Sequence, residues 1–155
     1  MLIEIIRFLP NLHTLEISSL PLLQSIGLSP NDSELLFSVS INSKIAKVKL
    51  EQMDEMEQIH FLFDLFPHMQ YLEVSCKTED DLENLVKFIL MNNITYIHHL
   101  KCLCICIPNA NEKMLENLKT MIDFETLFHV DTTSRVYAIR RRKDKIYLNW
   151  ELYDK

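Results

Sequence analysis

One eleven-residue segment occurs twice in the chain with the same pattern. FLPNLHTLEIS at residues 8–18 is matched by LFPHMQYLEVS at residues 65–75, with proline, leucine, glutamate and serine in register. Both copies place apolar residues at i, i+3 and i+5, and the same spacing recurs in IAKVKL at residues 45–50 and in LKCLCI at residues 100–105. Units repeated every ~20 to 50 residues stack into arrays, because each buries its apolar side only against its neighbours. We therefore predict four strands centred on Leu15, Val48, Leu72 and Leu103.

The segments between these strands have apolar residues at helical spacing. This periodicity predicts helices near residues 2–9, 53–66, 78–93 and 111–128. Pro10 and Pro67 follow two of the helices and end them before the copied strands begin. Thr78 and Asp81 form the expected N-terminal cap of the third helix. Residues 19–43 contain two prolines, the only glycine and many serines, so we expect a loop there with at most one helical turn at residues 33–37.

The C-terminal end has a different composition. RVYAIR at residues 135–140 and KIYLNWEL at residues 145–152 are rich in β-forming residues and flank the charged RRKD. This pattern predicts a hairpin that closes the edge of the sheet, with Trp150 packed inside it. We expect one domain over residues 1–155, with about four βα units in residues 1–128 and a terminal hairpin cap in residues 129–155.

Polar residues alternate with apolar residues along the predicted strands. A sheet covered on both faces has continuous apolar strands, whereas alternation leaves one face in water. The sequence therefore predicts an α/β fold in the form of a right-handed βα solenoid, with a parallel sheet on one side and helices on the other. In such an array Glu16, Lys49 and Glu73 form one cross-strand row.

The exposed sheet face is the predicted partner-binding surface, because open faces of stacked arrays commonly recognise other proteins. The alternative is a solvated ladder of charges that binds nothing. The candidate residues on this face are Thr14, Glu16, Lys47, Lys49, Tyr71 and Glu73.

Composition excludes several classes of function. The chain has 155 residues, a net charge of −6 and a pI near 5.5, which does not favour binding to nucleic acid or an anionic membrane. Its single glycine, Gly27, excludes a glycine-rich phosphate loop. We expect no signal peptide, no membrane span and a cytoplasmic location. The basic run RRRKDK at residues 140–145 leaves nuclear import, or a small anion-binding patch, as an alternative.

The densest group of metal-ligand residues is HHLKCLCIC at residues 98–106. On a strand Cys102, Cys104 and Cys106 share one face at steps of roughly 6.5 to 7 Å, wider than the ~4 Å between sulfurs on one tetrahedral zinc. We therefore expect these thiols to cover a sheet face beneath the C-terminal hairpin, with no metal and no cofactor. A thiol–metal site, with His98 or His99 nearby, is the alternative.

Neither a G-x-S-x-G elbow nor an H-E-x-x-H pair occurs in the sequence, and we predict no enzyme activity.

The strands LPNLHTLEIS and FPHMQYLEVS, with the later segment FILMNNITYIHHLKCLCICIPNANEKMLENL, resemble the leucine-rich-repeat region of F-box proteins. In that family the repeats bind a substrate, and a separate N-terminal F-box docks the ubiquitin-ligase adaptor. We expect no F-box here, because a helix begins at Met1, and hence no adaptor binding. The resemblance implies a protein-interaction module for substrate recognition. An incomplete repeat array without independent activity is the alternative.

Overall fold

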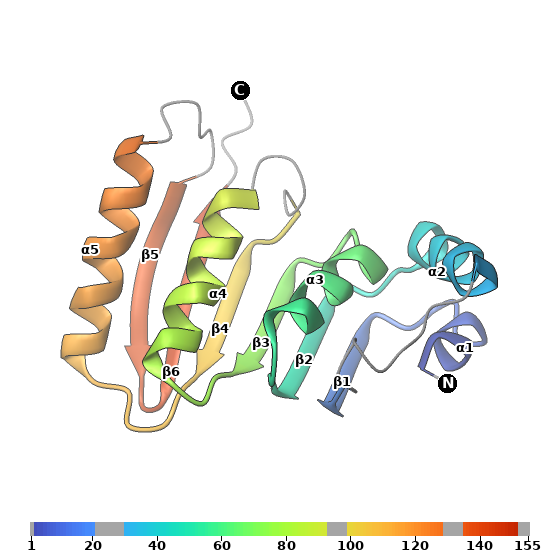
Figure 1. Ribbon diagram of the computed structural model, residues 1–155, viewed down its shortest axis with the longest axis horizontal. Helices are drawn as coiled ribbons and strands as arrows, with labels where there is room; N and C mark the ends of the chain where they lie inside the picture. The colour runs from blue at the N-terminus through green and yellow to red at the C-terminus, as the bar shows by residue number, and fades with distance from the viewer. Residues whose placement is uncertain (1, 21–29, 93–98, 129–134, 152–155) are drawn as a thin grey trace.

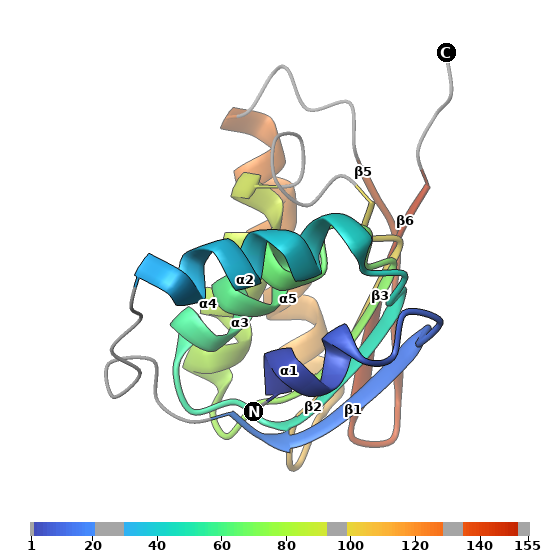
Figure 2. The same ribbon diagram turned by 90° about the vertical axis from the view of Figure 1, so that its right-hand side faces the viewer.

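Helices and strands alternate along the chain. The computed structural model describes residues 2–20, 30–92, 99–128 and 135–151. The described elements are α1 (Leu2–Arg7), β1 (Thr14–Ser19), α2 (Pro30–Asn42), β2 (Lys47–Gln52), α3 (Met56–Leu65), β3 (Tyr71–Ser75), α4 (Glu79–Asn92), β4 (Cys102–Cys106), α5 (Glu112–Phe128), β5 (Arg135–Arg142) and β6 (Lys145–Glu151). The strands form one sheet in the order β1-β2-β3-β4-β6-β5 (Figure 1). The helices gather on one side of it, which gives a two-layer α/β fold (Figure 2).

The first four strands are parallel and lie in sequence order, as predicted. Each junction between them starts in the same way. The carbonyl of the residue just before one strand accepts hydrogen bonds of 2.8 to 3.1 Å from two consecutive N–H groups at the start of the next strand. These carbonyls belong to His13, Ala46 and Gln70. The repeated apolar spacing in the sequence therefore corresponds to a repeated backbone geometry.

The C-terminal hairpin makes the sheet mixed. β6 pairs antiparallel with β4 and with β5, so the predicted hairpin does close the β4 edge. It lies beside β4 in the same sheet, however, and the expectation that the thiols of β4 lie beneath it is wrong. β5 also continues through Arg141 and Arg142, so the turn is only Lys143 and Asp144.

The core lies between the sheet and the helices. Its strand residues are the inward positions of the alternating pattern, such as Val48, Leu72 and Leu103, which belong to one buried cluster with apolar residues of α3, α4 and α5. The buried Ile146, Leu148 and Trp150 extend the same layer into β6. Trp150 is thus part of the main core. No helix in the described part of the chain is long and apolar enough to cross a membrane.

Four of the five helices were predicted from periodicity, and α2 was not. The expected loop at residues 19–43 is wrong for residues 30–42, which form a 13-residue helix; residues 21–29 lie outside the described ranges. The serine-rich sequence of α2 carries little amphipathic signal, although Val39 is buried in the core. The overlooked signal was Pro30, because proline is favoured at the first position of a helix.

Side-chain hydrogen bonds cap the N-termini of two helices, α4 and α3. Thr78 and Asp81 exchange hydrogen bonds of 3.2 Å at the start of α4, which confirms the predicted cap. At α3 the fully buried Gln58 accepts hydrogen bonds from the N–H groups of Asp54 and Glu55. Its amide nitrogen donates to the carbonyl of Leu20 at 2.8 Å. Gln58 therefore ties the start of α3 to the end of β1.

Candidate functional site

The open face of the sheet is the side opposite the helices. Strand register confirms the predicted row: Glu16 pairs with Lys49, and Lys49 pairs with Glu73. The same row continues through Cys104 and Tyr147 to the last strand. All six predicted binding residues lie on this face at outward positions of the first three strands; they are Thr14, Glu16, Lys47, Lys49, Tyr71 and Glu73.

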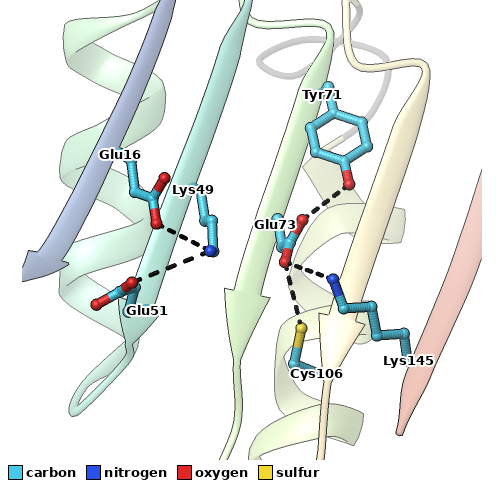
Figure 3. Close-up of polar contacts among 7 residues, drawn as sticks. All are labelled: Glu16, Lys49, Glu51, Tyr71, Glu73, Cys106 and Lys145. Atoms are coloured by element: carbon cyan, nitrogen blue, oxygen red, sulfur yellow. Dashed lines mark hydrogen bonds and ion pairs between the residues drawn. The ribbon is translucent and has the colours of Figure 1, made fainter. Parts of the chain in front are cut away.

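The charges of the central row separate into two groups (Figure 3). The Lys49 ammonium lies 2.9 Å from Glu16 and 4.0 Å from Glu51. The hydrogen bond from Lys49 holds the pKa of Glu16 below its ordinary value, and the same bond raises the pKa of Lys49. These side chains are exposed, so their pairing contributes little to stability and leaves them accessible to a partner.

Glu73 points away from Lys49 and toward β4 (Figure 3). One carboxylate oxygen accepts a hydrogen bond from the Tyr71 hydroxyl at 3.0 Å. The other accepts from the Lys145 ammonium at 3.0 Å and from the Cys106 thiol at 3.5 Å. The Glu73 side chain is only 13% exposed. Burial raises the pKa of Glu73, but the hydrogen bonds from Lys145 and Tyr71 outweigh burial and hold the pKa below its usual value.

Two thiols complete this arrangement. Cys104 pairs in register with Glu73, and its side chain is 0% exposed although it lies on the open face. The neighbouring polar side chains of Cys106, Tyr71 and Tyr147 outweigh burial and hold the pKa of Cys104 below its ordinary value. The neighbouring Cys104 thiol, together with burial, raises the pKa of Cys106. We call Tyr71, Glu73, Cys104, Cys106 and Lys145 the Glu73 cluster.

The sulfur atoms of Cys104 and Cys106 lie closer together than the predicted steps of roughly 6.5 to 7 Å. Their sulfur atoms and a carboxylate oxygen of Glu73 all lie within 4.8 Å of one another. Side chains on one face of a strand can lean toward each other, so their tips approach more closely than the backbone spacing of roughly 6.5 to 7 Å implies. Cys102 does not belong to this group, and burial raises its pKa.

The histidines considered as further ligands do not enter the group. His98 lies outside the described residues. The ring of His99 stacks edge-on against His68, with 5.1 Å between the ring centroids. Within the described ranges, the potential metal-ligand atoms that the fold brings together are therefore those of Glu73, Cys104 and Cys106.

The sequence pattern placed Glu73 and the cysteines on one sheet, but a contact between Glu73 and the thiols was not predicted from it. The signal was present, because the repeat aligns Leu72 with Leu103 and so places Glu73 beside Cys104. For Lys145 the sequence held no such signal, since its position depends on the pairing of β6 with β4.

The basic run at residues 140–145 is divided between the two sides of the sheet. The Arg140 guanidinium lies over the Tyr147 ring, 5.4 Å from its centroid, on the open face. Arg141 instead binds Glu112 of α5 at 2.8 and 3.0 Å. The Lys145 ammonium belongs to the Glu73 cluster. Three of the basic side chains in this run therefore make contacts within the chain.

A hollow of about 420 Å³ borders the Glu73 cluster where the parallel strands end. Cys106 and Ser75 line it from the strands, and Asp144 lines it from the hairpin turn. Ligands of parallel α/β sheets commonly bind beyond the carboxyl ends of the strands. The cluster therefore has an approach from solvent on the side of Cys106. Comparison of the chain with protein-family models, with curated proteins and with solved structures gives no match.

Proposed function

We propose that the chain is a protein-interaction module that binds a protein partner on its open face. The observation that carries this proposal is the asymmetry of the sheet: five helices lie against one face, and no described helix lies over the other (Figure 2). Open sheet faces of stacked βα arrays form extended binding surfaces. The module acts by recognition, and the proposal assigns it no catalytic step.

The proposed contact residues are the six on β1, β2 and β3. Lys49 and Glu16 present opposite charges side by side. Lys47, two residues before Lys49 on the same face of β2, adds a second exposed cation. Tyr71 supplies aromatic surface, which is enriched in protein interfaces. The partner that fits this surface is a protein segment with both acidic and basic side chains.

The finer architecture belongs to the same proposal. We take the chain to be a leucine-rich-repeat-like, right-handed βα solenoid with the hairpin as its terminal cap. The repeated strand spacing and the identical hydrogen bonds that follow His13, Ala46 and Gln70 support this proposal. Parallel βαβ connections are right-handed in nearly all proteins.

The resemblance to the repeats of F-box proteins makes substrate recognition for a ubiquitin ligase the proposed role. The partner would then be a substrate protein, rather than the ligase adaptor, a nucleic acid or a membrane. The proposed compartment is the cytoplasm, with the nucleus as the alternative that the basic run suggests.

The test is affinity capture from a reducing cell lysate with the purified chain, followed by mass spectrometry. Lys49→Glu and Tyr71→Ala should each reduce recovery of the same partner by about tenfold or more, as expected when an interface residue contributes ~1.4 kcal/mol. Lys119→Glu is the matched control, because it makes the same charge change at an exposed position of α5, on the helical side.

Retention of the partner by both sheet variants, or capture of no specific protein, would overturn the proposed surface. Recovery of the ligase adaptor with the wild-type chain would contradict the expected lack of adaptor binding. Circular dichroism of each variant separates a lost contact from a lost fold.

A further inference from the structure

The Glu73 cluster contains three ligand groups of the kind that hold a thiophilic metal. Two thiols come from β4 and one carboxylate comes from β3, and their ligand atoms lie within 4.8 Å of one another. We propose that Cys104, Cys106 and Glu73 form a binding site for a single zinc ion. This site shares Glu73 with the proposed partner-binding surface, but zinc binding can be measured on the purified chain alone, without a partner.

The geometry needs only a small adjustment to hold the ion. Zinc binds thiolate sulfur at about 2.3 Å and carboxylate oxygen at about 2.0 to 2.2 Å, which separates two sulfurs on one ion by about 4 Å. The three ligand atoms are within about an ångström of that arrangement. Rotation of the half-buried Cys106 side chain would bring its sulfur closer to the Cys104 sulfur without moving the backbone of β4.

The choice of ligands favours zinc over other metals. Thiolates disfavour Mg²⁺ and Ca²⁺, which take oxygen ligands. Cu(I) would be satisfied by Cys104 and Cys106 alone, whereas zinc also uses carboxylate oxygen. The contribution of Glu73 therefore distinguishes the two metals. A zinc ion with three protein ligands keeps a fourth position open for water or a ligand, and the hollow lined by Cys106 gives this side of the site access to solvent.

Lys145 competes with the metal for Glu73. Its ammonium lies 3.0 Å from the carboxylate oxygen that also contacts Cys106. A cation bound at this oxygen must either displace the ammonium, which breaks the ion pair, or lie beside it, which costs free energy through like-charge repulsion. Tyr71 is bonded to the other oxygen and can keep the carboxylate oriented. Removal of the Lys145 charge should therefore strengthen zinc binding, although it removes an ion pair from the fold.

The test is zinc titration of the purified, reduced full chain against a competing chromophoric chelator. Cadmium is a second probe, because its thiolate complexes absorb in the ultraviolet. The wild-type chain should bind one equivalent of each metal. Cys104→Ser and Cys106→Ser should each weaken binding by more than about 100-fold, and Glu73→Gln by about tenfold or more, since even groups outside the ligand shell change affinity by roughly 10- to 100-fold.

Two further variants make the test specific. Cys102→Ser removes a thiol from the same strand but outside the group, and it should leave the affinity unchanged. Lys145→Met should tighten binding by several-fold. Circular dichroism checks the fold, and the half-buried Cys106 provides a test even where substitution of the buried Cys104 disturbs the core.

The absence of stoichiometric zinc binding would overturn the site. An equal loss in Cys102→Ser would also overturn it, since the thiols of β4 would then bind metal without regard to the arrangement found here. Unchanged affinity in Glu73→Gln would remove the carboxylate from the site and leave a two-thiolate site of the Cu(I) type.

Discussion

The Lys145 ammonium lies 3.0 Å from the carboxylate of Glu73, although the two residues are 72 positions apart in the chain and β4 runs between their strands. Glu73 is mostly buried, while Lys145 is 44% exposed. This contact joins the C-terminal hairpin to the repeated strands on the open face. It also brings a cation to the only group of Cys, His, Asp and Glu ligand atoms that the described residues assemble.

A double-mutant cycle of Glu73→Gln and Lys145→Met should show that the two side chains are energetically coupled. We expect a coupling free energy of about 0.5 to 1 kcal/mol, because the ammonium is partly in water and the pair is screened by salt. Urea denaturation at low and high ionic strength measures the coupling, which should decrease as salt increases. Glu16→Gln with Lys145→Met is the control cycle, because Glu16 pairs with Lys49 instead. Coupling of equal size in both cycles would contradict the contact.

Gln58→Met should destabilise the fold by about 1 to 3 kcal/mol, because the Leu20 carbonyl and the start of α3 would lose their buried hydrogen bonds. Methionine has a similar length, so the lost hydrogen bonds and not a cavity should dominate the effect. Gln70→Met is the matched control, since the Gln70 side chain is exposed. Equal stability of the two variants in chemical denaturation would rule out this role of Gln58.

Asp64→Asn should raise the melting temperature near pH 7 but not near pH 3. Partial desolvation raises the pKa of Asp64 although its side chain is exposed, and His60 opposes the shift. The residue lies in the last turn of α3, where the helix dipole disfavours an acid. The ionised carboxylate is therefore less favourable in the folded chain than in the unfolded one. Its cost is absent below the unfolded pKa of about 3.8 and fully present above the raised folded pKa.

Asp54→Asn makes the same chemical change as Asp64→Asn but should lower the melting temperature near pH 7. A hydrogen bond from Lys77 at 2.6 Å, with another from Gln52, holds the pKa of Asp54 below its ordinary value. Its stabilising contribution is present at neutral pH and is lost as the pH falls through the folded pKa. Thermal unfolding of both variants across pH 3 to 7 should give differences of opposite sign, and shifts in the same direction would refute both assignments.

Lys143→Gly should stabilise the C-terminal hairpin. Lys143 has a φ of 56° in the two-residue turn, a conformation that costs a residue with a Cβ atom more than it costs glycine. We expect a gain of about 0.5 to 1 kcal/mol in the free energy of unfolding. Asn109, with a φ of 59°, is the control, because asparagine already tolerates this region and Asn109→Gly should change little. A loss of stability in Lys143→Gly would contradict the turn geometry.

Local patterns in the sequence predicted most of the repeat. The spacing of Leu15, Val48 and Leu72 located the strands. With parallel strands in sequence order, it aligned Glu16, Lys49 and Glu73 in one row, as the register shows. These features are local, because an apolar residue every second position determines which side of a strand is buried. Helix α2 was missed for the same reason: its serine-rich sequence carries little periodicity, and packing against α1 and α3 determines it instead.

The candidate site depended on contacts that local patterns do not encode. An alternating run of cysteines indicates that the thiols share one face, but not that Cys104 and Cys106 lean together or that Glu73 turns toward them and away from Lys49. That direction follows from Lys145, which offers a cation on the far side of β4. The sequence by itself determined the repeated strands, their register and their polar face, because apolar periodicity acts over a few residues. Only the tertiary structure decided which edge the hairpin pairs with and which charges meet there, because pairing between distant strands is chosen by the packing of the whole sheet.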